Sequence, residues 1–470
     1  MTVLYSLPAR LLLLTVAWGL VAPSGFASAV EPARPEGLPG GLKEAQAAFN
    51  KQQYDQALQL LESLGKSGRV APDVRRLKVR TLAKAGKPKD ALAEYEGITD
   101  TTKKNDPPLL REVAFGFIIP MLKDMRVQMR GAGYTALKEI ESEESVPYFE
   151  DGLSDGAGQV RALAAEGLGH FEAGRRSPRL KNALQDQAAY VRKYAVQALG
   201  KTGDRGMAGL IEKSLEDEEP LVRVAAAGAL ARLNQPLGWE RLGGSAKSRN
   251  PEERSAALPT LGLLKRGTSF QELEAAVGDD QPSVRAAAVS GLGDLGERKA
   301  GPVLLKALHD PIPGVSGAAV IGLGKLHYAE AMNDVKHTLN DKNPGVRADA
   351  VAVLLEFGEP YATVAGTVRE LMGDKEPGIR ARVSRSLAKS RGESIRDAVE
   401  GLRLLLQDAL PLPRMTAVRA LGHVSSPQAA TILKEALHDE DDAVRAAAAG
   451  ALIRVLDGKA GTGKSDPSEG

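Results

Sequence analysis

The chain has 470 residues, with 62 Lys and Arg against 60 Asp and Glu, and aromatic residues make up 4% of it. A chain of this length is too long for one compact hydrophobic core, so it must form several domains or a repeat array. Because the positive and negative charges nearly balance, the chain has no net electrostatic field that would attract nucleic acid. The absence of cysteine excludes disulfides and thiol lipidation.

Residues 1–29 have the pattern of a secretory signal peptide. Arg10 is the only charged residue before the apolar run Leu11–Ala22, which is shorter than the roughly 20 residues of a membrane-spanning helix. Ala27-Ser28-Ala29 has the small residues of a cleavage site. We expect cleavage after Ala29, no membrane insertion afterwards, and a periplasmic or secreted mature protein. The alternative is an uncleaved membrane anchor.

Residues 30–41 are rich in Pro and Gly and predict a flexible lead-in. Helical periodicity begins near Leu42, and two helical pairs are expected over residues 42–99. Ala57 and Ala91 lie 34 residues apart, and each is followed by Leu. This segment resembles a pair of tetratricopeptide (TPR) repeats, in which a small Ala lets the two helices of a repeat approach closely.

Residues 107–123 predict a connecting helix that begins at Pro107. It contains the most apolar run of the mature chain, Phe115–Ile119. We expect this helix to join the first module to the following array and to cover the first repeat. An exposed partner site is the alternative for such a run.

A repeated motif occupies residues 124–456. It occurs eleven times, and in each copy one position, nearly always Arg, serves as a marker for counting. A Leu stands seven residues after the marker in every copy, and an Asp stands six residues before the marker in ten copies. The period is 31 residues as far as position 347, then 33, 34 and 31. A fixed period of this length indicates a solenoid, whose units bury their apolar faces against one another. Ser316 fills the marker position in one copy. In the other ten copies the marker is an Arg, at Arg130, Arg161, Arg192, Arg223, Arg254, Arg285, Arg347, Arg380, Arg414 and Arg445.

Punctuating residues predict where the helices of each unit begin and end. In seven copies a Pro stands three residues after the Asp position, where it fits the first turn of a helix. Asn250 and Asn343 immediately precede such prolines and are expected to act as N-caps. In six copies a Gly follows the shared Leu, and we expect the helix to end there with a positive φ.

These features resemble HEAT repeats of the short bacterial kind found in phycobilin lyases and deoxyhypusine hydroxylases. The resemblance implies an all-α fold, an α-solenoid, in which helix pairs form a right-handed superhelix. The two TPR-like units would precede about eleven HEAT-like repeats. It also implies that the Asp and Arg form a ladder, Asp155 with Arg161 and Asp186 with Arg192, and that the second helix of each pair lines the concave face.

The last copy contains a first helix but no second one. We therefore expect this helix to cap the array with one side facing water, and residues 457–470 to form a disordered tail. The tail contains GKAGTGKS from Gly458 to Ser465, which matches a phosphate-binding pattern. A helix rather than a strand precedes it, so we do not expect a nucleotide site.

No arrangement of residues predicts catalysis, and we expect neither a cofactor nor a metal ion. The six histidines are dispersed along the array, and the His-Glu dipeptides that bind iron in the similar hydroxylases are absent. The function that these observations favour is an exported, non-catalytic scaffold that binds protein partners on its concave surface. The alternative is a HEAT-repeat enzyme or cofactor binder of the lyase or hydroxylase type.

A row of basic residues on the predicted second helices is the candidate partner site. If these helices line the concave face, the row can meet an acidic segment of a partner protein. Acidic residues at or beside the same positions offer the alternative of a solvated face of mixed charge. The row comprises Lys306, Lys336, Arg369, Arg403 and Lys434.

Overall fold

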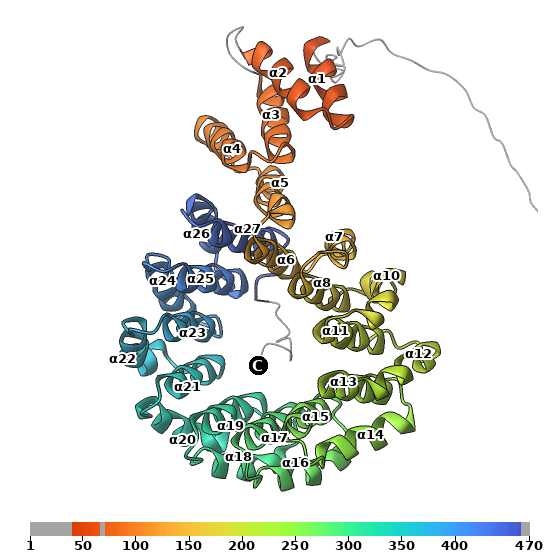
Figure 1. Cartoon of the computed structure of the whole chain (residues 1–470). Coiled ribbons are helices and arrows are strands. Elements are labelled where there is room, and N and C mark those ends of the chain that lie inside the picture. The colour runs from red at the N-terminus through yellow and green to blue at the C-terminus, as the bar shows by residue number, and fades with distance from the viewer. Residues whose placement is uncertain (1–39, 66–70, 462–470) are drawn as a thin grey trace, which may run out of the picture.

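The structure is a computed structural model that describes residues 40–65 and 71–461. The signal peptide expected at 1–29, most of the lead-in and the last nine residues lie outside the described part. Every regular element in the described ranges is a helix, which confirms the predicted all-α solenoid (Figure 1).

Two helical hairpins and one connecting helix form the N-terminal module. Ala57 and Ala91, whose spacing suggested the hairpins, are both fully buried. Gly86 turns the chain between the third and fourth helices with φ 74°. The helices are α1 (Gly40–Asn50), α2 (Tyr54–Gly65), α3 (Pro72–Lys84), α4 (Pro88–Thr102) and α5 (Pro107–Ile118), followed by η1 (Ile119–Lys123).

The array consists of eleven long first helices with shorter elements between them. The first helices are α6 (Val127–Ile140), α8 (Gly158–His170), α11 (Ala189–Gly200), α13 (Pro220–Arg232), α15 (Pro251–Leu263), α17 (Pro282–Leu295), α19 (Pro313–Lys325), α21 (Pro344–Glu356), α23 (Pro377–Leu387), α25 (Pro411–His423) and α27 (Asp442–Leu456). The second helices are α7 (Val146–Gly152), α10 (Pro178–Asn182), α12 (Ala208–Glu212), α14 (Pro236–Ala246), α16 (Phe270–Ala276), α18 (Gly301–Ala307), α20 (Met332–His337), α22 (Tyr361–Met372), α24 (Ser394–Leu405) and α26 (Ala429–Glu435).

Short connecting elements complete the units. These are α9 (Glu172–Arg175), η2 (Glu143–Ser145), η3 (Ala183–Gln185), η4 (Arg205–Met207), η5 (Lys213–Glu216), η6 (Gly267–Ser269), η7 (Arg298–Ala300), η8 (Ala329–Ala331), η9 (Thr338–Asn340) and η10 (Ala436–His438).

The local signals in the sequence place the helix starts correctly. Each of the seven prolines is the first residue of a first helix, where no backbone donor is lost. Asn250 accepts a hydrogen bond from the amide of Glu252 at 2.9 Å, and Asn343 accepts one from Gly345 at 2.9 Å. Both asparagines are therefore N-caps, as expected.

Of the six glycines that follow the shared Leu, only Gly200 is the last residue of its helix, and the expected helix end with a positive φ is wrong. None of the six has a positive φ. They are contact points between successive first helices: a Cβ on Gly293 would lie 2.7 Å from the Cα of Gly322, and one on Gly200 would lie 2.5 Å from the Cβ of Ala229. Glycine stands here because only a hydrogen atom fits between the helices.

These close contacts decide the curvature of the array. Neighbouring first helices pack along their length, whereas neighbouring second helices touch little. The solenoid therefore bends towards its first helices, which line the inner side, while the second helices stand outside (Figure 1). The expectation that the second helices line the concave face is wrong for this reason.

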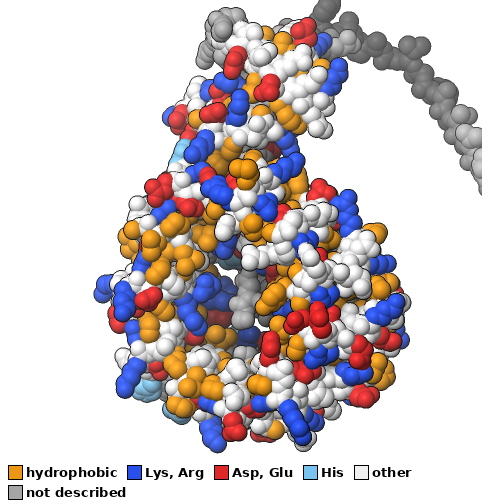
Figure 2. All heavy atoms as spheres, viewed as in Figure 1, with side chains coloured by type: hydrophobic (Ala, Val, Ile, Leu, Met, Phe, Trp, Pro, Cys, Tyr) orange, Lys and Arg blue, Asp and Glu red, His pale blue; other side chains and the backbone are white. Residues whose placement is uncertain are grey.

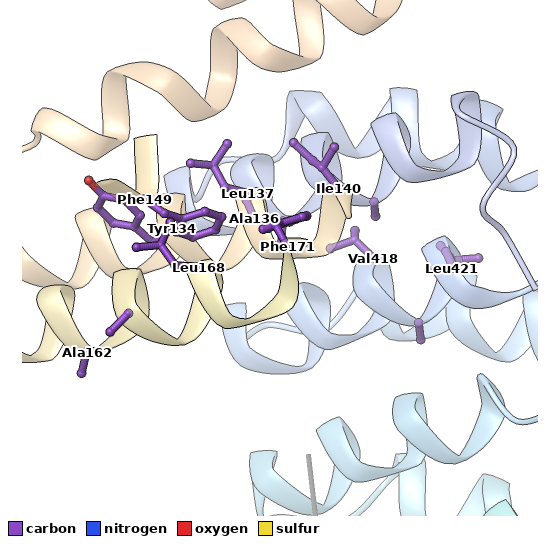
Figure 3. Close-up of a cluster of buried hydrophobic side chains, with 14 of the residues drawn as sticks. Tyr134, Ala136, Leu137, Ile140, Phe149, Ala162, Leu168, Phe171, Val418 and Leu421 are labelled. Carbon is purple, nitrogen blue, oxygen red and sulfur yellow. The ribbon is translucent and has the colours of Figure 1, made fainter. Parts of the chain in front are cut away.

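The array closes into a ring. The last helix, α27, packs against α6 at the start of the array and against α5 of the N-terminal module (Figure 1). Ala446 to Ala449 are all buried. The prediction of a cap with one side in water is therefore wrong, and α5 packs more on the last helix of the array than on the first. One apolar core runs continuously from α2 to α27. Figure 3 shows the part of it that includes Leu137 and Ile140 of α6 and Val418 of α25.

A glycine also permits the contact at the seam. A Cβ on Gly450 would lie 2.7 Å from the carbonyl oxygen of Ala136. At the regular joints the residue eight after the marker, such as Gly422, meets the residue six after the next marker, such as Ala451. Gly450 is only five residues after its marker, so the seam is shifted by about one helical turn from the regular packing.

Charged pairs join the two ends of the array around this contact. Lys459 donates to the carbonyl oxygens of Ile140 and Glu141 at 2.8 and 2.9 Å, which satisfies the C-terminal end of α6. This first part of GKAGTGKS therefore has a structural role; Thr462 to Ser465 lie outside the described residues. Ion pairs across the seam include Arg111–Asp457 (2.7 Å), Arg126–Asp442 (3.2 Å) and Arg454–Glu141 (2.6 Å). The imidazoles of His423 and His438 hydrogen-bond Glu139 at 3.2 Å and Glu96 at 3.1 Å.

An Arg–Asp ladder links the regular units, but its pairing differs from the expected one. Arg161 binds the carboxylate of Asp186 in the next unit, while its Nη1 donates to the backbone carbonyl of Asp155 in its own unit. Each guanidinium thus ties its own turn to the following unit. The same pattern recurs, at 2.5 to 2.9 Å, in Arg130–Asp155, Arg161–Asp186, Arg192–Asp217, Arg254–Asp279, Arg285–Asp310, Arg380–Asp408 and Arg414–Asp439.

The ladder is interrupted where the sequence departs from the motif. Ser316 is buried and its hydroxyl donates to the carbonyl oxygen of Pro313, so no cation from this position reaches Asp341. Arg223, which would face Ser248, approaches Glu253 at 3.9 Å. Arg347 pairs with Glu370, outside the ladder.

We predict that Gly450→Leu opens the ring. The larger side chain cannot fit against the backbone of Ala136, so α27 must move away from α6. Small-angle scattering should show an increased radius of gyration while circular dichroism stays helical. Gly366→Leu is the matched control, because no atom lies within 4 Å of a Cβ at Gly366. Equal scattering from both variants would contradict the closed ring.

We also predict a graded stability along the ladder. Arg192→Ser should lower the free energy of unfolding by about 1–3 kcal/mol, because the partly buried carboxylate of Asp217 loses its partner. Ser316→Arg should raise it, because Asp341 gains one. Hydrogen exchange should be faster over residues 300–325 than over 180–230, since repeat arrays open first at a weak joint. Uniform exchange, with no change in melting temperature on Ser316→Arg, would contradict a stabilising ladder.

Candidate functional site

The inner wall of the ring is the candidate functional site. On each first helix from α6 to α25, the residues two before and two, five and nine after the marker are spaced as one helical face; on α27 the residues two, five and nine after the marker are buried in the seam. The other faces contact the neighbouring first helices and the outer layer. This stripe therefore faces the hollow, which Figure 2 shows as an opening through the ring.

One side of the inner wall presents tyrosines. Tyr190 and Tyr194 lie one turn apart on the stripe of α11, and Tyr190 is 61% exposed. Lys193 lies over the Tyr194 ring at 5.0 Å, and burial lowers the pKa of its ammonium group. Exposed tyrosine combines a large apolar face with a polar tip, which suits a contact surface for another polypeptide.

The facing side is basic. Arg382, Arg385 and Lys389 follow one another on the stripe of α23 and the turn after it, and Arg419 continues the patch on α25. Figure 2 shows Lys and Arg side chains on this side of the opening, and α11 and α23 stand across the hollow from each other (Figure 1). Arg382 holds Asp349 with two oxygen contacts at 2.6 Å, and Lys389 lies 3.7 Å from Glu356. Both side chains remain 38% exposed.

The structure places the predicted basic row on the outside of the ring. Lys306 and Arg369 are exposed on α18 and α22. Lys336 pairs with Glu359 at 2.7 Å, and Arg403 lies 3.8 Å from Glu435. The fifth residue, Lys434, lies 3.8 Å from Glu96 of the N-terminal module and so belongs to the seam. The five residues follow the outer face from unit to unit and do not converge on one point.

Buried charges in the described ranges are used for joining units. Arg161, Arg192 and Arg414 hold the ladder, and Arg454, with no exposed surface, pairs across the seam. Arg445 hydrogen-bonds Asp442, which in turn binds Arg126 of the first unit. Asp349 differs, because burial raises its pKa against the opposing effect of Arg382.

Two cavities in the described part offer no convergent reactive groups. One of about 180 Å³ lies beside the seam, between η1 and the start of α27. The other, of about 410 Å³, lies in the N-terminal module, where Arg75 and Lys78 both pair with Glu94 at 2.7 and 3.0 Å. Within residues 40–65 and 71–461, no three His, Asp or Glu side chains group as metal ligands, and no helix is both long and apolar enough to cross a membrane.

The sequence analysis missed the inner-wall residues because it assigned the wrong helix to the concave face. The signal was present: Arg382, Arg385 and Lys389 are spaced by three and four residues, which puts them on one face of a helix. Tyr190 and Tyr194 have the same kind of spacing. Knowing which face is concave is what turns these patterns into a candidate site.

The comparison with protein families agrees with this architecture. A family model for HEAT repeats matches residues 177–257, 239–324, 301–365 and 364–453. The search of curated proteins finds no match. Among solved structures, YibA of E. coli aligns at 14% identity (57% of this chain, 98% of YibA; TM-score 0.35). Human deoxyhypusine hydroxylase aligns at 19% identity (55% of this chain, 98% of that one; TM-score 0.27). The CpcE–CpcF phycocyanin lyase of Nostoc sp. PCC7120 aligns at 21% identity (55% and 92%; TM-score 0.30).

The stacked helix pairs and their ladder define an α-solenoid protein. The repeat matches extend from residue 177 to 453, more than half of the chain. The chain therefore belongs to the HEAT-repeat family, as the motif in the sequence indicated.

The ladder predicts how stability depends on pH. Hydrogen bonding to Arg254 lowers the pKa of Asp279. At Asp217 burial acts to raise the pKa, but the Arg192 guanidinium outweighs it, so the folded-state pKa again lies below the usual one. A carboxyl with a lowered pKa stabilises the fold above its unfolded pKa of about 4, and this contribution is lost as the pH falls through the folded value.

Unfolding by urea should therefore give a constant ladder contribution from pH 7 to 5 and a steep loss below about pH 4. Arg192→Ser removes the pair that lowers the pKa of Asp217, so the stability gap between this variant and the wild type should narrow on acidification. A gap that is the same at pH 7 and pH 3 would contradict this assignment.

Proposed function

We propose that this protein is an exported, non-catalytic scaffold that binds a partner protein on the inner wall of its HEAT ring. The observation that carries the proposal is the use of charge: buried charged side chains in the described ranges join repeats or close the seam. The exposed side chains of the inner wall are spread along a continuous surface. Such a surface suits binding of a polypeptide and lacks the convergent groups of a catalytic site.

Export is part of the proposal and rests on residues 1–29. The short apolar run after Arg10 and the Ala-Ser-Ala motif support a cleaved signal peptide. The scaffold would then act in the periplasm or outside the cell. A chain without cysteine is insensitive to the redox poise of either compartment.

Site-specific photo-crosslinking in the native host tests this function. A photo-reactive amino acid replaces Ile321, which is 37% exposed on the inner stripe of α19. The matched control replaces Gly366 on the outer helix α22. We expect a discrete protein adduct from position 321 and none from position 366. Adducts of equal yield from both positions, or none from 321, would contradict binding at the inner wall.

Two measurements on the purified protein, its intact mass and its content of chromophore or iron, test the remaining parts of the proposal. Its intact mass should correspond to a chain that begins at Val30; a chain that begins at Met1 and stays in the cytoplasm would remove export from the proposal. A visible chromophore or stoichiometric iron would instead support a cofactor-binding HEAT protein, the function of the lyase or hydroxylase type.

A further inference from the structure

The joint between α13 and α15 has no ladder pair. Arg223 donates to two backbone carbonyl oxygens of its own unit at 2.8 and 2.9 Å, but the carboxylate of Glu253 in the next unit lies 3.9 Å away. Ser245 and Ser248 donate to that carboxylate at 3.0 and 2.8 Å, so it is already engaged. The charged hydrogen bonds that fix one unit on the next in the regular ladder are therefore missing at this joint.

The joint between α19 and α21 lacks this link as well. Ser316 donates within its own helix, to the carbonyl oxygen of Pro313. Asp341, the ladder carboxylate of the next unit, accepts a hydrogen bond from the amide of Asn343 in its own turn at 2.7 Å. Among the described residues, no ladder hydrogen bond therefore crosses this joint.

The neighbouring joint, between α21 and α23, is tied in another way. Arg382 contacts both carboxylate oxygens of Asp349 at 2.6 Å, and Ser386 donates to the carbonyl oxygen of Ala348 at 2.7 Å. These bonds take the place of the ladder pair, so the joint between α21 and α23 keeps a hydrogen-bonded link.

Between the two interrupted joints lie the three units from α15 to α20, which we call the base. Both joints within the base have a ladder pair. Their first helices also touch backbone to backbone: a Cβ on Gly262 would lie 2.2 Å from the carbonyl oxygen of Gly291, and Gly293 meets Gly322 in the same way. The base is therefore held by ladder hydrogen bonds and close packing together.

Side chains fill the crossing points at the two interrupted joints. The residue six after the marker is Thr260 at one and Val353 at the other, where the base has glycine. Their methyl groups would lie 2.5 Å from a Cβ on Gly228 and 2.8 Å from one on Gly324. Both helix pairs also pack together less extensively than the pairs within the base. These joints thus combine weaker packing with a missing link.

We propose that the seam is a gate and that the ring opens on these two joints as hinges. One arm, from α6 to α14, turns on the joint between α13 and α15. The other arm, from α21 to α27, turns on the joint between α19 and α21. The base keeps its shape, and α27 separates from α5 and α6. Motion concentrates at these joints because they have the fewest bonds to break. The opening itself does not depend on the proposed function, but its use as an entrance for the partner rests on it.

The position and chemistry of the seam suit a gate. The seam lies across the hollow from the base (Figure 1), so small rotations at the two hinges add to a large separation at the seam. The seam pair Arg126–Asp442 has side chains that are 57% and 43% exposed, so dissolved salt weakens it. The gate can therefore open while the contacts within the base stay intact.

Distance measurements between two spin labels test this inference on the full mature chain. The chain has no cysteine, so introduced cysteines are the only labelling sites. Ser154→Cys and Thr431→Cys place exposed labels beside α7 and on α26, one on each arm. In a separate protein, Ala275→Cys and Asn333→Cys place exposed labels on α16 and α20, at the two ends of the base.

Pulsed electron paramagnetic resonance should give two distances for the arm pair, a closed one and a longer open one. The base pair should give one narrow distance. Added salt should raise the open fraction, because it screens the ion pairs of the seam. A single narrow distance for the arm pair at every salt concentration would overturn the inference, and so would a base pair as broad as the arm pair.

Variants that restore the missing ladder pairs test the hinges. Ser248→Asp with Glu253→Val returns the carboxylate to the ladder position without changing the net charge, and Ser316→Arg supplies the missing guanidinium. Together they should lower the open fraction severalfold. Gly366→Arg adds the same charge as Ser316→Arg outside the ladder and should leave the open fraction unaltered. Circular dichroism verifies that all variants fold. An open fraction that the restored pairs leave unchanged would overturn the assignment of the hinges.

The distance measurement needs no partner, so it separates this inference from the proposed function. If the arm pair stays narrow while position 321 cross-links a partner, the scaffold function stands and the gate is overturned. If the arm pair opens while position 321 yields no adduct, the gate stands and the proposed function falls.

Discussion

The shape of this protein depends on the close approach of its first helices. Glycine and alanine occupy the crossing points, so that Gly293 meets Gly322 and Gly200 meets Ala229 at distances no larger side chain allows. The outer helices are not drawn together in this way. A solenoid that is packed tightly on one side and loosely on the other must bend towards the tight side, and repetition over eleven units brings its ends together.

The seam is then closed by chemistry that differs from the regular joints. Within the array, the marker Arg of most units donates to a backbone carbonyl of its own unit and binds the Asp carboxylate of the next unit. Apolar packing completes the contact between these units. At the seam, Arg445 reaches Arg126 of the first unit only through Asp442, and the helices meet one turn out of register. The N-terminal module contributes to the closure, because α5 and α4 place Arg111 and Glu96 against the last unit. The ring and the module are in this sense one structure.

Curvature also decides which side chains are available for binding. Because the first helices are inside, the row from Lys306 to Lys434 faces outwards, and three of its members lie near carboxylates. The inner wall presents tyrosines on α11 and cations on α23. The concave surface of a repeat protein is thus defined by packing between units, and the sequence of any single unit carries little information about it.

The sequence by itself determined the helices, the repeat, the proline starts, the Asn250 and Asn343 caps and the existence of an Arg–Asp ladder, because each depends on residues close together in the chain or on a fixed period. It misassigned the ladder pairing by one unit, since Asp155 is near Arg161 in sequence but Arg130 is the residue whose guanidinium reaches its carboxylate. Only the tertiary structure decided the direction of bending, the burial of α27 and the position of the inner wall. These follow from small angles summed over ten joints and from contacts such as Gly450 with Ala136, for which no local pattern exists.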